Sequence, residues 1–245
     1  MSALWATFLR ELRAYFVSPL AYVVMFFLLV LHGIVFSLIA TYLSDPRQPS
    51  GRPFDYFFGG FPFWLIVLFA VPVITMRLVA EERKSGSIEV LMTAPVSEGQ
   101  VVAGKFLASL AFWIVLWLPT VLYAVILERY GDVDWGTLGA GYLGILLLGA
   151  FFLAIGVMTS ALTKNQIVAA VAAFSLSLFV FFVGFVTGLV DEPWLQELTG
   201  YVSVIDHMDE LRRGIVDTRR LVYYLSGTFF FLFVAARALE DRKWR

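Results

Sequence analysis

The sequence predicts an all-α polytopic membrane protein, organised as one transmembrane domain over residues 1–245. Hydrophobic residues make up 60% of the chain and charged residues only 15%, whereas a soluble domain has about a quarter charged. The apolar residues also gather into six stretches, each close to the ~20 residues that a bilayer core requires. The formal net charge of −1 gives no indication of nucleic-acid binding, and the lack of cysteine excludes disulfides and thiolate metal sites.

Residues 1–17 are predicted to form an amphipathic helix that lies along the membrane surface. Phe8 and Leu12 belong to an apolar stripe at helical spacing, and Arg10 and Arg13 occupy the other side. A signal peptide is the alternative, but the apolar run that follows is too long and no small-residue cleavage site follows it. We therefore expect this helix to contact membrane lipid.

Six predicted spans follow this helix, giving six transmembrane helices. The first begins after the Ser18-Pro19 break, and Gly59, Gly60 and Pro62 interrupt the second. The last span is acceptable if Arg237 extends its charged end to the interface. The predicted spans cover residues 20–42, 56–76, 106–127, 138–162, 167–190 and 221–239.

The distribution of basic residues predicts that both termini are cytoplasmic. In that orientation 11 lysines and arginines face the cytoplasm and 7 face outside, as the positive-inside rule requires. The polar segment 77–105, between spans two and three, is then cytoplasmic, and segment 191–220, before span six, is extracytoplasmic.

The extracytoplasmic segment 191–220 contains a predicted amphipathic helix. Its apolar residues recur at helical spacing and lie opposite a charged face. We expect it to rest on the outer membrane surface or to dip into it. It is either a plain linker or a gate on a translocation path, and the candidate gate residues are Met208, Leu211 and Ile215, in a stripe that begins at Val204.

The spans contain almost no ionisable residue at membrane depth. Ion-coupled carriers place charged or histidine side chains there, because burying them costs about 2.5–3.5 kcal/mol and is tolerated only for function. His32 is the lone candidate, and packing is the simpler explanation for it. Ion-coupled transport is therefore disfavoured.

Residues 99–105 match the first seven positions of a phosphate-binding loop. Phe106 then occupies the position where that loop needs Ser or Thr to hold magnesium, and no strand precedes the match. We expect no cofactor in this chain and no ATP hydrolysis by it. Gly184 and Gly188 form a GxxxG pair in the fifth span, which favours close helix packing inside the chain or in a dimer.

Residues 81–96, Glu-Glu-Arg-Lys-Ser-Gly-Ser-Ile-Glu-Val-Leu-Met-Thr-Ala-Pro-Val, closely resemble a signature of type-2 ABC transporter permeases. That signature reads E-x(3–4)-G-[ST]-[IL]-E-x-L-x-[AT]-x-P-[VI]. The N-terminal helix, residues 16–22, the six spans and the tail from Arg213 to Ser226 extend the resemblance, and these features look like the gliding-motility-type branch.

The resemblance implies a permease subunit of an ABC exporter in a bacterial inner membrane. A separate cytoplasmic ATPase would bind ATP and magnesium, and a permease homodimer would move the substrate outward, with or without an extracytoplasmic auxiliary protein. Segment 77–105 would hold the coupling helix, and the N-terminal helix with Phe8, Arg10 and Arg13 would also contact the ATPase. The candidate coupling residues are Glu81, Glu82, Gly86, Glu89, Leu91 and Pro95.

The residues of this segment suit docking on independent grounds. Its glutamates can accept charge-assisted hydrogen bonds from a basic partner, and the apolar side chains around Leu91 form a knob. Gly86 and Pro95 bound a short rigid element. The alternative function is a membrane anchor that recruits an ATPase to an envelope or motility machine without moving a solute.

Overall fold

The computed structural model describes residues 3–47, 51–86, 96–187 and 192–240. These residues are almost entirely helical and contain no strand, and six helical segments among them are long and apolar enough to cross a membrane. The predicted all-α polytopic fold with six spans is confirmed.

The six candidate spans overlap the six predicted stretches, and some of them are interrupted. The first is α2 (Pro19–Leu43), and the second is α4 (Phe61–Thr75), continued by α5 (Ala80–Ser85). The third begins as α7 (Glu98–Trp117), passes through a 3₁₀ turn η1 (Leu118–Thr120) and ends as α8 (Val121–Glu128). The last three are α9 (Trp135–Leu162), α10 (Gln166–Thr187) and α13 (Thr218–Glu240).

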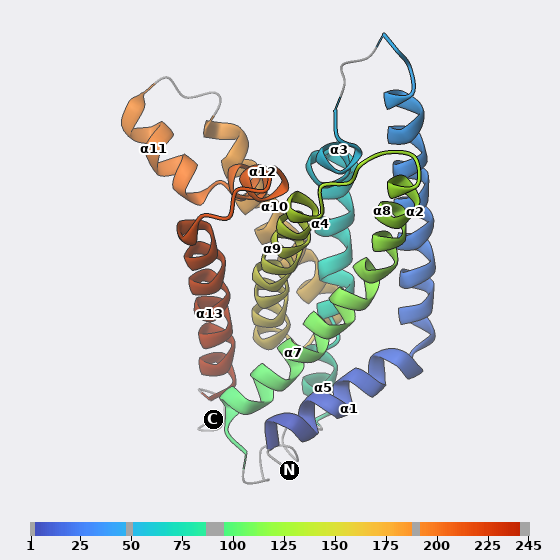
Figure 1. Cartoon of the computed structure of the whole chain (residues 1–245). Helices are drawn as coiled ribbons and strands as arrows, with labels where there is room; N and C mark the ends of the chain where they lie inside the picture. The colour runs from blue at the N-terminus through green and yellow to red at the C-terminus, as the bar shows by residue number, and fades with distance from the viewer. Residues whose placement is uncertain (1–2, 48–50, 87–95, 188–191, 241–245) are drawn as a thin grey trace.

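Four further helices lie at the two ends of the bundle (Figure 1). Helix α1 (Ala3–Val17) crosses one end beside α5, which we call the α5 end. Helices α3 (Pro53–Gly59), α11 (Pro193–Val202) and α12 (Val204–Arg212) lie at the opposite end, the α12 end. The start of α1 and the end of α13 both lie at the α5 end, as an even number of spans requires.

Glycine and proline lie at two of the breaks between consecutive helices. Gly60 has extended backbone and separates α3 from α4, so the predicted span 56–76 begins within one helix and continues in another. Pro62 lies in the first turn of α4, where a missing amide hydrogen costs nothing. Pro119 lies in η1, and its ring explains the tighter turn between α7 and α8.

Helix α9 is the centre of the bundle because small residues let its neighbours approach closely. A Cβ at Gly149 would lie 2.1 Å from Trp113 Nε1, and a Cβ at Gly156 would lie 2.1 Å from Thr75 Oγ1. The Trp113 Nε1–H donates to the Ile145 carbonyl at 3.1 Å, which satisfies the polar atom of this buried ring. These contacts place α7 and α4 directly against α9.

His32 packs in an aromatic cluster between α2, α3 and α7. Its ring lies 4.4 Å from the Trp117 ring and 5.7 Å from the Phe57 ring, measured between centroids. The side chain is buried, and neither ring nitrogen has a hydrogen-bond partner among the described residues. These contacts are those of a packing residue.

Candidate functional site

The short helix α5 opens the polar segment 77–105. Glu81 and Glu82 lie in its first turn and Arg83 and Lys84 in its last, so both pairs complement the helix dipole. Gly86 ends the helix with a φ of 74°, a left-handed conformation that glycine adopts without strain. The predicted helix at 87–93, with Glu89, Leu91 and Pro95, lies outside the described residues.

The last turn of α9 holds the start of α5. Val79 occupies the N-cap position of α5 and has no side-chain oxygen for the free amides there. The Ser160 hydroxyl accepts hydrogen bonds from the Val79 and Ala80 amides, both at 3.1 Å, and donates to the Met76 carbonyl at 3.3 Å. The buried Arg83 side chain also donates to the Ala161 carbonyl. A side chain of α9 therefore caps the start of α5, which has no capping side chain of its own.

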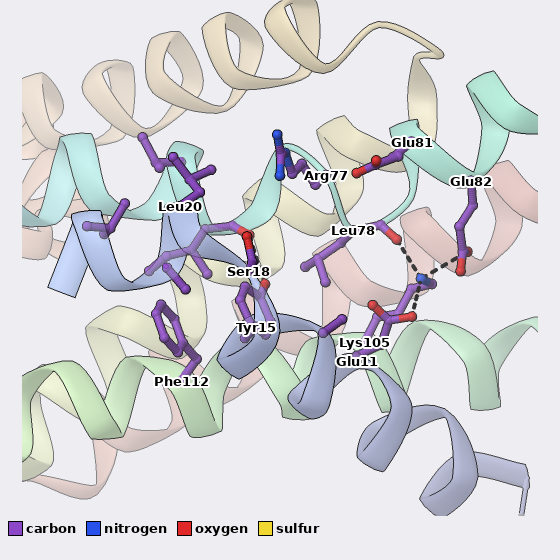
Figure 2. Close-up of a pocket in the computed structure, with 15 residues that line it drawn as sticks. Glu11, Tyr15, Ser18, Leu20, Arg77, Leu78, Glu81, Glu82, Lys105 and Phe112 are labelled. Atoms are coloured by element: carbon purple, nitrogen blue, oxygen red, sulfur yellow. Dashed lines mark hydrogen bonds and ion pairs between the residues drawn. The ribbon is translucent and has the colours of Figure 1, made fainter.

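Four charged side chains from three helices form what we call the ionic cluster. Lys105 of α7, with a side chain 1% exposed, places Nζ 2.8 Å from Glu11 Oε1 of α1 and 2.9 Å from Glu82 Oε2 of α5. Arg10 of α1 lies 2.6 Å from the other Glu82 oxygen and 2.8 Å from Glu11 Oε1. Lys105 Nζ also donates to the Leu78 carbonyl at 2.5 Å. Figure 2 shows the contacts from Glu11, Leu78 and Glu82 converging on Lys105.

The ionic cluster ties helix α1 to the polar segment 77–105. Two carboxylates meet two cations, so the charges in the cluster balance. A buried cation needs such partners, because removing one charge of a buried pair leaves the other uncompensated, at a cost of about 3–5 kcal/mol. Displacing α5 alone would break this arrangement, so α5 is fixed to α1 and α7 as well as to α9.

The residues predicted to contact the ATPase lie partly in the ionic cluster and partly outside it. Glu82 and Arg10 belong to it, whereas Glu81 and Arg13 form no ion pair with another described residue. Phe8 is half-buried and stacks on Trp5, with 4.9 Å between the ring centroids.

Sequence reasoning missed Glu11, Lys105, Arg83 and Ser160. A signal did exist for Lys105, since it stands at the beginning of a long apolar stretch and therefore needs a counter-ion. Ser160 carried no such signal, because small polar residues are common in transmembrane helices.

The α12 end contains two amphipathic helices where the sequence predicted one. The stripe of α12 is buried at Val204, Met208 and Leu211, whereas Ile215 lies beyond the end of the helix and is 53% exposed. The apolar stripe packs on α9, where a Cβ at Gly144 would lie 2.9 Å from Met208 Sδ. The apolar face of α12 thus meets the bundle itself, so it does not rest on lipid as expected.

Charged groups bind α12 to its neighbours. The Arg212 guanidinium donates to the Asp55 carbonyl of α3 at 3.0 Å and pairs with Asp209 at 2.6 Å. Arg220 of α13 pairs with Glu210 and donates to His207 Nδ1 at 2.6 Å. His207 is therefore neutral, and its Nε2–H donates to the Tyr201 carbonyl at 3.1 Å.

Of the two glycines predicted to allow close helix packing, Gly184 and Gly188, only Gly184 lies among the described residues. A Cβ at Gly184 of α10 would lie 2.9 Å from both Ser203 Oγ and Ile205 Cδ1, so Gly184 serves packing within the chain. Gly188 lies outside the described residues. Among the residues that the structure covers, no group of three or more His, Cys, Asp or Glu could hold a metal ion.

A family model described as "ABC-2 family transporter protein" matches residues 53–238. The chain is 25% identical over 153 residues to "Probable multidrug ABC transporter permease YbhR" of Escherichia coli (strain K12), covering 62% of this chain and 41% of that protein. It is 31% identical over 200 residues to "ABC transporter permease protein NatB" of Bacillus subtilis (strain 168), covering 73% of this chain and 51% of that protein. The match thus spans about half the length of these relatives or less.

Proposed function

Because the chain belongs to the ABC-2 family of transporter proteins, we propose that it is the membrane-spanning permease subunit of an ATP-driven exporter. A separate cytoplasmic ABC ATPase subunit binds ATP and magnesium and supplies the energy. The permease lies in a bacterial inner membrane with both termini cytoplasmic, and two copies move the substrate outward between them. The α5 end then faces the ATPase, and the α12 end faces outside.

The attachment of α5 to three other helices carries this proposal. Ser160 and Arg83 join α5 to α9, and Glu82 joins it to α1 and α7 through the ionic cluster. A movement of the ATPase against segment 77–105 therefore acts on the bundle as a whole. Helix α9 carries that movement toward the α12 end, where it packs on Met208. Such rigid-body motion suits alternation between inward-open and outward-open states.

The exposed faces of the bundle support a pair of permease subunits. Helix α2 leaves Phe26, Phe27, Ile34 and Leu38 exposed along one side. Lipid covers such a face in a single copy, and a second copy covers part of it in a homodimer. The assignment to the gliding-motility-type branch remains a prediction from residues 16–22 and 213–226, and an extracytoplasmic auxiliary protein remains a possible further partner.

The test is to purify the chain from its native membrane and to reconstitute it in vesicles with the ATPase that accompanies it. We expect the permease to stimulate ATP hydrolysis. Glu82→Gln and Arg83→Gln should reduce this stimulation, whereas Lys84→Gln, on the same short helix but exposed, should not. Glu89→Lys should abolish stimulation and leave membrane insertion intact.

The same vesicles separate an exporter from an anchor. An exporter moves a solute extracted from the native cells when ATP is present, and the Glu82 variant moves less of it. An ATPase that binds tightly, hydrolyses ATP and moves no solute from the native extract would replace our proposal with the anchor. If no ATPase accompanies the chain and none is stimulated by it, the proposal is wrong.

A further inference from the structure

Two cavities meet between α2 and α4. The first has a volume of about 200 Å³, lies at the α5 end and is bounded by α1, α2, α4, α5 and α7 (Figure 2). The second, of about 420 Å³, runs between α2 and α4, and every residue that lines it is apolar. Val24 and Val73 line both cavities, so the two adjoin at these residues, and together they offer a polar end and an apolar end.

The charges of the polar end divide into two sets. Glu11, Glu82 and Lys105 belong to the ionic cluster and have counter-ions in it. Arg77 and Glu81 also line the cavity, and neither side chain has an ion pair or hydrogen bond with another described residue. Figure 2 shows these two side chains on the same side of the cavity, away from Lys105. One cation and one anion are therefore available to a ligand.

The position of this space suits a membrane amphiphile. The amphipathic helix α1 crosses the bundle beside the polar end, at the level where an interfacial helix meets lipid headgroups. The apolar end runs from there between two transmembrane helices, so its occupant lies in the hydrocarbon region. Its volume falls within the ~300–1,000 Å³ that is typical of ligand sites.

We propose that this space binds one membrane phospholipid with a zwitterionic headgroup of the phosphoethanolamine type. The lipid phosphate pairs with Arg77, its ammonium pairs with Glu81, and one acyl chain enters the groove between α2 and α4. An anionic lipid without an ammonium would satisfy Arg77 and leave Glu81 close to its phosphate, which is unfavourable. The charge pair therefore selects a zwitterion over an anion.

The experiment is native mass spectrometry of the purified full chain, titrated with three phospholipids that share the same acyl chains. Phosphatidylethanolamine should bind more tightly than phosphatidylglycerol, which has no cation, and phosphatidylcholine should be weaker because its ammonium has no N–H donor. Arg77→Gln should weaken binding of all three about tenfold, the size of one charge-assisted hydrogen bond. Glu81→Gln should remove the preference for phosphatidylethanolamine over phosphatidylglycerol.

Matched variants distinguish binding at this site from the binding of lipid that surrounds any membrane protein. Arg129→Gln changes an exposed arginine of the α12 end and should leave binding unchanged. Val73→Phe should block the passage between the two cavities, while Val73→Ala widens it and preserves binding. Val171→Phe, at a position of α10 that is 59% exposed, controls for the added ring.

Two results would overturn the proposal. Equal binding of phosphatidylethanolamine and phosphatidylglycerol by the unaltered chain would mean that the site does not distinguish the two headgroups. Unchanged binding in both the Arg77 and Glu81 variants would mean that the bound lipid is only the lipid that surrounds any membrane protein. The measurement needs no ATPase and no transported substrate, so its failure would leave the proposed function standing.

Discussion

Lys105 Nζ of α7 and Glu11 Oε1 of α1 form an ion pair 2.8 Å long, although 94 positions separate them in the chain. With Glu82 and Arg10, this pair fastens helix α1 to the polar segment 77–105, which we propose as the coupling region. The contact is buried on the lysine side, so its loss lowers the stability of the fold.

Replacing Lys105 with methionine should destabilise the protein by about 3–5 kcal/mol, because Glu11 and Glu82 lose their buried counter-ion. Thermal unfolding of the purified chain, followed by loss of helical circular dichroism, measures the effect. Lys164→Met removes an exposed lysine and should change little. Equal unfolding temperatures for the two variants would show that the cluster adds no stability.

Replacing Ser160 with alanine should loosen the start of α5. The Val79 and Ala80 amides lose their shared acceptor, a loss of about 1 kcal/mol, or about fivefold in the local opening equilibrium. Hydrogen exchange at these two amides should accelerate by that factor. Ser109→Ala is the matched control, because Ser109 is equally buried but bonds to the Phe106 carbonyl of its own helix.

Replacing Gly156 with alanine should cost about 1–3 kcal/mol of stability, because the new Cβ would overlap the Thr75 side chain. Gly139 lies on the same helix, and a Cβ there meets nothing within 4 Å. Gly139→Ala should therefore be neutral or slightly stabilising. Denaturant unfolding of both variants compares them, and a mild effect at Gly156 would mean that α4 and α9 separate easily.

The contact between α12 and α13 should weaken in mild acid. Burial lowers the pKa of His207 below 6.5, and the Arg220 guanidinium lowers it further, although the Tyr201 carbonyl, Asp206 and Glu210 act in the opposite direction. The folded protein then holds fewer protons on His207 than the unfolded chain does just below pH 6.5. Stability therefore falls as the pH falls through that window.

Thermal unfolding at ~pH 7.5 and ~pH 5.5 measures this effect. Both values lie above 4.5, and the Arg220 hydrogen bond holds the pKa of Glu210 below that value, so Glu210 does not contribute. His207→Gln keeps a donor and an acceptor without a titrating group, and it should reduce the difference between the two pH values. An identical difference in this variant would assign the effect to other groups.

The sequence predicted the number of candidate spans, but the packing at the ends of the bundle only in part. Long charge-free stretches identified six spans because a bilayer leaves no alternative for such apolar segments. At the α12 end the pattern around Met208 predicted a helix, yet it could not show that this helix faces α9. An apolar stripe has the same spacing whether it meets lipid or protein, and Ile215 continued the spacing after the helix had ended.

The sequence by itself determined that the chain is a helical membrane protein with six candidate spans. These features depend on local composition and spacing. Local composition decides them because a backbone group without a hydrogen bond in lipid is costly, so a long apolar segment must be helical. Only the tertiary structure decided that Glu11, Glu82 and Lys105 share one buried cluster, and that Ser160 caps a helix it does not belong to. Those contacts join residues far apart in the chain, and they depend on which helices the glycines of α9 allow to approach.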